Sequence, residues 1–519
     1  MPEVLHPGVF VEETGAGPRP IEGVPTSTAA FLGETERGGI RPRLITGYSE
    51  YLRWFGDVFD ADKFVPHAVR GFFENGGQRL YICRVVGREA KPAQAVFGDF
   101  TLQAAGPGSA GNRVWVRIED GTAKKPDGTS LGFRLRLACW NGNVDAFDPF
   151  TPEGQLKTPR PAQVEDFDDL TSDESSPGYF AKRLPFIDLG QDNTIRGLDN
   201  SALGILVRHA GVAATARPVD GSRALAEGAD DRHALGPDNY RGVDTQGITA
   251  LELALYCDVA LIYAPNVSND IAVEIIAHCE RLRSRFAVID CPQGQPNAAA
   301  MNPRAELGGS SSYAAFYYPW IVVSDPDTGA RKLIPPGGHC VGLYARMDSE
   351  RGVFKAPAGE TLRGALDLEF EINDETQDRL NSNGVNAIRR FPGRGILLWG
   401  ARTLSTDPEW KYISIRRLQI FLERSIAEGI QWVVFEPNDA RLWARVRDTI
   451  WQFLQAQWRS GALSGATEEK AFFVTCNETT MTQDDILNGR LICEIGIAPV
   501  RPAEFVIFRI FQHTAKATT

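Results

Sequence analysis

The chain has 519 residues, of which 43% are hydrophobic and 23% are charged, and its formal net charge at pH 7 is −11. This composition is typical of a globular protein long enough for about three domains. The acidic balance argues against a general nucleic-acid coat, which needs basic surfaces. No apolar run is long enough to span a bilayer, and the acidic N-terminus without an apolar h-region gives no sign of a signal peptide.

The first predicted element is a short strand in HPGVFVEE, close to the N-terminus. Val9 and Val11 alternate with Phe10 and Glu12, which is the period of a strand. A Gly- and Pro-rich stretch, TGAGPRPIEGVPTS, follows and predicts a flexible connection. Because a lone strand must pair with a distant segment or with another chain, we assign residues 1–20 to an N-terminal arm.

Helix-like and strand-like segments alternate over residues 21–90 and again over residues 236–385. The predicted strands are STAAFLGETERG, RLYICRVVG, VALIYAP and FAVIDCP. The predicted helices are SEYLRWFGD, FVPHAVRGFFENGG, GITALELALYCD, NDIAVEIIAHCERLRSR and PPGGHCVGLYARMDSERG. This alternation predicts a discontinuous α/β core domain with a largely parallel sheet.

The pattern changes between residues 91 and 235. FTLQAAG, NRVWVRIED and LGFRLRLACW alternate as strands do and are separated by Gly, Pro and Asp turns. The acidic stretch VEDFDDLTSDESSP follows, and we expect its DFDD and SDES clusters to lie in solvated loops because they lack calcium-loop spacing. The span is predicted to be a β-rich outer domain inserted into the α/β core.

A C-terminal α/β domain is predicted over residues 386–503, and residues 504–519 form a C-terminal arm. The predicted strands are RGILLWGARTL, QWVVFEP, AFFVTC and GRLICEIGIAPV. The two long helices are YISIRRLQIFLERSIAEGI and DARLWARVRDTIWQFLQAQWRSGAL, the second with Trp443, Ile450, Leu454 and Trp458 at helical spacing. The arm contains EFVIFRIFQ, in which Phe505 to Phe511 is apolar on both faces apart from Arg509, and this predicts a strand buried on both sides.

Motifs that would carry chemistry are weak. GPGSAG, residues 106–111, matches a dinucleotide fingerprint, but a strand-like segment follows it, and the fingerprint needs a helix there. There is no Walker A loop and no G-x-S-x-G elbow. His339, in PPGGHC, is the most suggestive histidine, although no motif pairs it with an Asp or a Ser. We therefore predict no catalytic residue, no cofactor site and no metal site.

The eight cysteines are scattered and contain no C-x-x-C pair, which argues against a zinc site and against a disulfide framework. Cys83 in LYICRVV and Cys493 in RLICEIG lie in apolar segments. We interpret the cysteines as small buried hydrophobic side chains in a reducing compartment.

Taken together, the sequence resembles the contractile tail sheath proteins of phages, pyocins and extracellular contractile injection systems. The matching stretches, in chain order, are HPGVFVEE, GVPTSTAAFLGETERG, LELALYCDVALIYAP, PPGGHCVGLYARMDSERGVFKAPAGE, GVNAIRRFPGRGILLWGARTLS, YISIRRLQIFLERSI and EIGIAPVRPAEFVIFRI. They cover nearly the whole chain outside the 91–235 insertion. The resemblance implies a structural subunit that polymerises helically around an inner tube and contracts to drive that tube through a target envelope.

The resemblance also gives the arms a role. In this family the N- and C-terminal arms leave their own subunit and complete the sheet of a neighbour's C-terminal domain, which is β-strand addition across chains. The residues that correspond to the exchanged strands are Gly8, Val9, Phe10, Val11 and Glu12 at the N-terminal end, and Phe505, Val506, Ile507, Phe508, Arg509 and Ile510 at the C-terminal end.

The implied partners are further copies of the chain or sheath paralogues, the inner tube protein, the baseplate, and a tail terminator or cap protein. No nucleic acid, membrane insertion or cofactor is implied. Assembly is expected in the bacterial cytoplasm, within a phage tail or an injection particle that can be released outside the cell. Two other classes stay open: an α/β hydrolase or nucleotide-binding enzyme with a site near His339, and a non-contractile surface assembly protein that uses the same arms.

Overall fold

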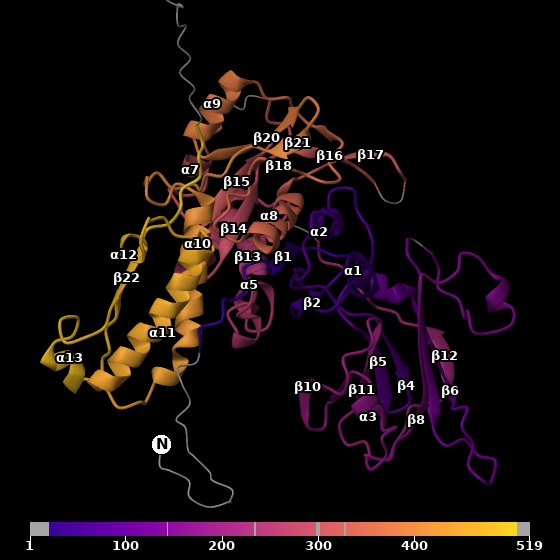
Figure 1. The fold of residues 1–519 in the computed structure, drawn as a ribbon. Coiled ribbons are helices and arrows are strands. Elements are labelled where there is room, and N and C mark those ends of the chain that lie inside the picture. Colours follow the sequence, from indigo (N-terminus) through magenta and orange to yellow (C-terminus); the bar gives the residue numbers. More distant parts are fainter. Residues whose placement is uncertain (1–19, 143, 233–234, 297–300, 326–327, 506–519) are drawn as a thin grey trace, which may run out of the picture. The chain divides into compact units, whose positions relative to one another are not determined.

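The computed structural model describes residues 20–505, except residues 143, 233–234, 297–300 and 326–327. The chain divides into two compact units. Figure 1 labels many of their helices and strands. The core unit comprises Pro25–Arg351 and Ala356–Ile413. In the described part of the chain, the C-terminal unit comprises residues 20–24, Gly352–Lys355 and residues 414–505.

The core unit is organised around a nine-stranded sheet with the order β18-β21-β20-β15-β14-β13-β1-β3-β2. Neighbouring strands from β20 to β3 are parallel, and the strands at both ends of this series are antiparallel to their neighbours. The strands are β1 (Ala29–Gly33), β2 (Arg43–Ile45), β3 (Leu80–Arg84), β13 (Leu261–Tyr263), β14 (Phe286–Asp290), β15 (Ala314–Tyr318), β18 (Glu360–Thr361), β20 (Val385–Phe391) and β21 (Gly395–Leu398). The predicted α/β core with a largely parallel sheet is confirmed.

The helices of the core unit are α1 (Tyr48–Phe55), α2 (Val65–Glu74), α4 (Pro237–Arg241), α5 (Gly247–Ala250), α6 (Asn269–Leu282), α7 (Pro303–Glu306), α8 (Gly337–Arg351) and α9 (Asp374–Ser382). A three-stranded sheet of β17 (Arg331–Ile334), β16 (Ile321–Ser324) and β19 (Asp367–Leu368) completes the unit outside the insertion. Every residue of β1, β3, β13 and β15 is buried, as expected for parallel strands covered on both faces.

Helices α2 and α8 approach each other closely because glycines line their contact. A Cβ atom on Gly342 would lie 2.4 Å from the carbonyl oxygen of Phe72, and one on Gly338 would lie 2.6 Å from the Cα atom of Ala68. On the other helix, a Cβ atom on Gly71 would lie 2.2 Å from the His339 ring. The absence of these three Cβ atoms brings the two histidines of this contact, His67 and His339, to one cavity.

Residues 91–235 form a mixed five-stranded sheet and an antiparallel four-stranded sheet that share one hydrophobic core. The five-stranded sheet contains β10 (Asp192–Arg196), β9 (Phe186–Asp188), β11 (Gly204–Arg208), β5 (Phe100–Ala104) and β4 (Gln94–Phe97), with β9 and β11 parallel. The four-stranded sheet contains β12 (Gly221–Ala224), β6 (Val114–Asp120), β7 (Phe133–Cys139) and β8 (Gln163–Leu170), and one short helix, α3 (Phe180–Arg183), packs nearby. A strand follows GPGSAG, after one turn of 3₁₀ helix, so this stretch lacks the helix of a dinucleotide site.

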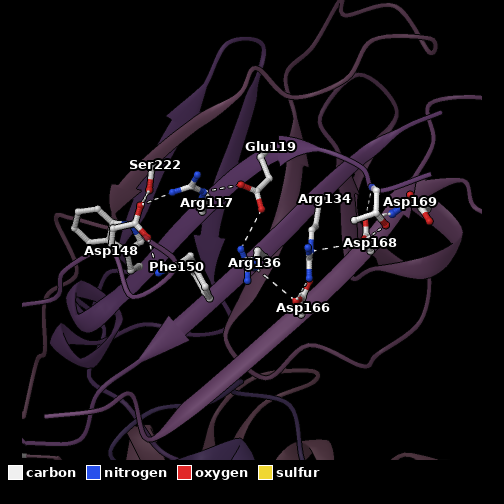
Figure 2. A network of polar contacts seen from close by, with 12 residues as sticks. Arg117, Glu119, Arg134, Arg136, Asp148, Phe150, Asp166, Asp168, Asp169 and Ser222 are labelled. Carbon is white, nitrogen blue, oxygen red and sulfur yellow. Dashed lines mark hydrogen bonds and ion pairs between the residues drawn. The ribbon is translucent and has the colours of Figure 1, made fainter. Parts of the chain in front are cut away.

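The face of the four-stranded sheet that points away from the hydrophobic core carries a series of ion pairs, shown in Figure 2. Arg117 and Arg136 lie directly opposite each other on β6 and β7, an arrangement that is unfavourable unless anions lie between them. Glu119 supplies that charge, with an oxygen 2.7 Å from Arg117 Nε and another 3.1 Å from Arg136 Nη1. Asp166 pairs with Arg134 across the next strand at 2.6 Å.

The expectation of a solvated loop for the DFDD cluster is therefore wrong. These residues lie in β8, where Asp166 and Asp168 face the arginines of β7. Phe167 and Leu170 of the same strand pack on the hydrophobic core instead. The acidic cluster is a strand because its carboxylates find partners across the sheet and its apolar residues find the core.

The C-terminal unit contains α10 (Ile413–Gly429), α11 (Ala440–Arg459), α12 (Glu468–Ala471), α13 (Gln483–Leu487), β22 (Phe472–Thr475) and β23 (Glu494–Ile497). Its core holds one face of α11, namely Leu442, Trp443, Val446, Ile450, Phe453 and Leu454. The predicted helical spacing of Trp443, Ile450 and Leu454 is thus confirmed. Ile21 joins this core, because Gly429 leaves the space that a Cβ atom, 2.6 Å from the Ile21 side chain, would fill.

Two domain boundaries of the sequence analysis differ from this division. Residues 386–413 were assigned to the C-terminal domain, but β20 pairs with β15 and β21 pairs with β20, so both strands belong to the core sheet. Residues 21–24 were assigned to the core domain, but they belong to the C-terminal unit, where the Val24 amide donates to Ser425 Oγ at 3.1 Å. In both cases, strand pairing or packing joins segments that the sequence pattern assigns to different domains.

Two local predictions also differ. GITALELALYCD is not one helix, because α5 ends at Ala250 and a short 3₁₀ turn follows at Ala254–Tyr256. QWVVFEP is not a strand, because Gln431–Val433 form a 3₁₀ turn and Phe435 is fully exposed with a φ of +71°.

The insertion and the core sheet of the same unit meet at a buried ion pair. Glu36, which is 4% exposed, lies 2.6 Å from Arg113 Nη2 of the insertion. The other carboxylate oxygen of Glu36 accepts the amide of Asp57 at 3.0 Å. Nearby, Arg37 donates to Gln163 Oε1 at 2.7 Å. Removing one partner of such a pair leaves a charge that water cannot reach.

We expect Arg113→Met to lower the free energy of unfolding of the core unit by about 3 kcal/mol or more, because the buried Glu36 carboxyl group then loses its charged partner. Adding Glu36→Gln to Arg113→Met should recover much of that loss. Urea unfolding followed by tryptophan fluorescence measures both changes. As a control, Arg196→Met breaks the exposed Arg196–Asp192 pair and should leave stability nearly unchanged, because water screens this pair. Equal losses for Arg113→Met and Arg196→Met would contradict the buried pair.

Candidate functional site

A cavity of about 170 Å³ surrounds the histidine that the sequence singled out. It lies between α2, α8, β16 and the 364–366 segment, and its lining residues are His67, Arg70, Gly71, Glu74, Val323, Ser324, His339, Gly364 and Leu366. Sequence reasoning missed His67, because nothing in VPHAVRG distinguishes it from an ordinary helix residue. It reaches the cavity only through the close packing of the two helices.

Both histidines are buried and uncharged at neutral pH. His339 is 2% exposed, and burial, with smaller contributions from His67 and Arg70, lowers its pKa to about 4. His67 is 3% exposed, and burial, followed by the charge of Lys332, lowers its pKa to about 4 as well. Neither His339 Nδ1 nor His67 Nε2 has a hydrogen-bond partner among the described residues.

The cavity does not have the arrangement of a hydrolase. A nucleophile needs a base within hydrogen-bond reach, and no hydrogen bond in the described part of the chain joins Ser324 to either histidine. Cys340, next to His339, is fully buried, and burial raises the pKa of its thiol well above the ordinary value. Outside the gaps at 1–19, 143, 233–234, 297–300, 326–327 and 506–519, no group of three His, Cys, Asp or Glu could hold a metal ion.

The carboxyl ends of β13 and β14 are the other place where a parallel sheet commonly binds a ligand. Here Asp290 accepts the amide of Gly337, the first residue of α8, at 2.8 Å and the hydroxyl of Tyr263 at 2.7 Å. Burial raises the pKa of Asp290 to about 7, and these hydrogen bonds oppose that rise. Asp290 therefore stabilises the N-terminal end of α8 by accepting its first amide, and this role does not require a ligand.

The hairpin of β22 and β23 in the C-terminal unit is a candidate site for the addition of a further β-strand. The two strands form a two-stranded antiparallel sheet, and residues 498–500, which follow β23, pair with residues 462–464. Within the part of the chain that the structure describes, no further strand lies beside β22 or β23 themselves. An isolated two-stranded sheet is marginally stable, because each strand leaves half of its backbone groups pointing outward. Phe473 (55% exposed) and Ile495 (37% exposed) add apolar surface to it.

The register identifies the outward-pointing groups. The amide of Ala498 donates to the carbonyl of Ala471 at 2.8 Å, which makes 471 and 498 a hydrogen-bonded pair. Because such pairs alternate along an antiparallel ladder, Val474 and Ile495 form a non-hydrogen-bonded pair. The N–H groups of these two residues therefore point to the two opposite edges of the hairpin. Each edge has the hydrogen-bonding groups that an added strand requires.

The predicted exchange residues lie almost entirely outside the described residues. Gly8, Val9, Phe10, Val11 and Glu12 precede residue 20, and Val506, Ile507, Phe508, Arg509 and Ile510 follow residue 505. Phe505 itself is described and is 70% exposed. The structure thus describes a candidate acceptor and leaves the exchanged strands as a prediction. The sequence predicted both hairpin strands, but open edges depend on what pairs beside them and leave no mark in the sequence.

The two buried histidines should make the core unit acid-sensitive. Below about pH 6.5 the unfolded chain binds protons at these positions, whereas the folded chain binds them only near pH 4, so stability falls as the pH falls through this range. Each histidine contributes about 3 kcal/mol to that loss. We expect His67→Gln and His339→Gln to flatten the dependence of the melting temperature on pH between about pH 7 and about pH 4.5.

The matched control for this experiment is His209→Gln, in the insertion, where His209 Nε2 lies 2.8 Å from Thr101 Oγ1. His278, whose pKa burial lowers to about 3, remains in all variants and gives a residual slope. Unchanged slopes in both cavity variants would show that His67 and His339 do not titrate as buried groups.

Comparison with known proteins identifies two consecutive family domains. Residues 243–404 match the family model of the phage tail sheath protein central domain, and residues 405–513 match that of the phage tail sheath C-terminal domain. A putative prophage major tail sheath protein of Pseudomonas aeruginosa strain UCBPP-PA14 is 25% identical over 256 residues, which are 48% of this chain and 64% of that protein. The chain thus spans slightly less than two thirds of this relative.

Solved structures share the fold. The helical sheath of the anti-feeding prophage in its contracted state gives a TM-score of 0.58 at 23% identity, covering 98% of this chain and 99% of that chain. The PVC sheath complex of an extracellular contractile injection system, also contracted, gives a TM-score of 0.57 at 23% identity, covering 98% of each chain.

The two family models follow each other without a gap and together match more than half of the sequence. The chain therefore belongs to the phage tail sheath family.

Proposed function

We propose that the protein is the structural subunit of a contractile tail sheath, which polymerises helically around an inner tube and contracts to drive the tube through a target envelope. The observation that carries this proposal is the β22–β23 hairpin, whose two edges lack partner strands within the described chain. It lies in the region that matches the phage tail sheath C-terminal domain. Membership of a family of structural sheath proteins supports an action without catalytic chemistry.

In this proposal the arms of neighbouring subunits complete the hairpin. Residues 8–12 of one neighbour and residues 505–510 of another add as strands to the edges at Val474 and Ile495. The main-chain hydrogen bonds of an added strand do not depend on the identity of the side chains. The Gly- and Pro-rich stretch after residue 12 lets a subunit rotate while its strand stays paired.

The proposal also covers partners and place of assembly. The extended polymer would form from the baseplate around the inner tube protein, end at a terminator or cap protein, and assemble in the bacterial cytoplasm. Contraction would bury more surface between subunits, and the free energy released would move the tube without nucleotide hydrolysis. No helix in the described residues is both long and apolar enough to cross a bilayer.

We expect Ile507→Pro to abolish tube formation and leave the subunit folded. Proline removes a backbone donor and clashes within a sheet, at a cost of about 3 kcal/mol or more for every link of the lattice. Deleting residues 1–14 should have the same effect. Negative-stain electron microscopy reports tubes, and circular dichroism of the same sample reports folding.

The acceptor is tested by Val474→Pro and Ile495→Pro, which each remove one outward donor and keep the hydrogen bonds of the hairpin itself. Val474→Ala and Ile495→Ala are the matched controls, because they shorten the same side chains and keep the amides. Full-length tubes from Ile507→Pro and from both proline variants of the acceptor would contradict strand exchange. An unfolded Ile507→Pro monomer would show instead that this strand completes its own subunit.

A further inference from the structure

Two cysteines face each other at one end of the β22–β23 hairpin. Cys476 directly follows β22 and Cys493 directly precedes β23. The register pairs Phe472 with Ile497 and Thr475 with Glu494, so its next step places Cys476 opposite Cys493. The sequence does not suggest this pairing, because residues 477–492 separate the two cysteines and each cysteine lies in an apolar segment.

The phase of the ladder determines the geometry of this pair. Counting from the hydrogen-bonded pair Ala471–Ala498, Cys476 and Cys493 occupy a non-hydrogen-bonded position. The Cα atoms of such pairs lie about 4.5 Å apart, with the side chains close together. A disulfide spans Cα separations of about 4.4–6.8 Å, so the backbone need not move for a bond to form.

Hydrogen bonds hold the pair in register on both sides. The Thr475–Glu494 pair closes the ladder on one side. On the other side, Thr480 Oγ1 donates to the carbonyl of Ile492 at 2.8 Å. The connecting segment is held as well, because Arg490 pairs with Asp484 at 2.7 Å and with Asp485 at 2.8 Å. The two thiols are therefore positioned by the surrounding backbone.

The two thiols differ in accessibility and acidity. Cys476 is 3% exposed, whereas Cys493 is half-buried and reaches solvent. The Cys493 thiol hydrogen-bonds to Cys476 and lowers the pKa of Cys476, burial opposes this effect, and the charge of Arg447 adds to it. A thiolate is the reactive form of cysteine in disulfide exchange.

We propose that Cys476 and Cys493 are a dithiol site that a low-molecular-weight disulfide oxidises to an intramolecular disulfide. One thiolate of the pair attacks a sulfur of the reagent, whose S–S bond breaks and releases one small thiol. The second thiolate then attacks the protein sulfur of the mixed disulfide and releases the second small thiol. The pair loses two electrons and two protons, and the reagent gains both.

The bond would join the two hairpin strands covalently where they separate into residues 477–492. It would form only after the protein leaves a reducing compartment, where thiols stay reduced. The inference depends on the hairpin of a single chain and stands whether or not the protein forms a sheath.

The test treats the purified full-length protein, under native conditions, with oxidised glutathione. Remaining thiols are blocked with N-ethylmaleimide before a tryptic digest without reductant. Trypsin cleaves after Lys470 and Arg490, which places Cys476 and Cys493 on separate peptides. We expect mass spectrometry to find these two peptides joined, lighter by two hydrogen atoms than their sum. Blocked Cys476 together with a glutathione adduct on Cys493 would overturn the proposal.

Two controls sharpen the result. Cys257 is exposed and should carry a glutathione adduct, which shows that the reagent is active. A mixture of ¹⁵N-labelled and unlabelled protein separates linkage within one chain from linkage between chains. Joined peptides of mixed isotope content would overturn the intramolecular bond. Cys476→Ser should leave Cys493 as the glutathione adduct, and the wild-type measurement does not depend on the folding of this variant.

Discussion

The open edges of a two-stranded sheet are the constraint on which the C-terminal unit depends. An antiparallel pair directs half of its backbone groups away from its partner, and in β22 and β23 these groups include the amides of Val474 and Ile495. Nothing within the described chain pairs with them. A longer sheet could satisfy them internally, but a hairpin of two four-residue strands cannot. Each edge therefore has backbone groups that could pair with an added strand.

The core unit differs from the C-terminal unit, because most strands of its sheet have a partner on each side. Its central strands are buried on both faces and pair on both sides, so the sheet offers few groups for exchange. The glycines between α2 and α8 allow backbone-to-backbone contact, and Asp290 satisfies the first amide of α8. The insertion joins this unit through Glu36 and Arg113. The core unit therefore satisfies its strand edges and buried polar groups largely within itself.

Much of the core fold followed from the sequence because its segments are long and strongly periodic. The buried runs of β1, β3, β13 and β14 and the helices α2, α6 and α8 were predicted at nearly their observed places. The predictions that were wrong concern short apolar or charged runs. In QWVVFEP, Trp432 and Val433 pack on the core of the C-terminal unit from a turn, while Phe435 is exposed. A period of two over so few residues cannot distinguish this turn from a strand.

The candidate sites were harder to predict for a different reason. His339 was found from its glycine-rich surroundings, but the cavity also needs His67, which α2 brings to it from a distant part of the chain. Cys476 and Cys493 lie opposite each other because of the register between β22 and β23, which backbone hydrogen bonds set. Single-sequence patterns report which residues are buried in an element. They do not report which element lies beside it.

The buried Glu36–Arg113 pair has a consequence for protein engineering. Replacing the whole 91–235 span with a foreign domain would remove Arg113 and leave the buried Glu36 without its partner, unless Glu36 were replaced by a neutral residue at the same time. The turn between β6 and β7 offers a better place for a fused cargo. Residues 124–130 of this turn are exposed or nearly so, and an isolated bridge between Lys124 and Ser130 closes its base. A payload carried there would extend the tip of a hairpin and leave every buried charge with its partner.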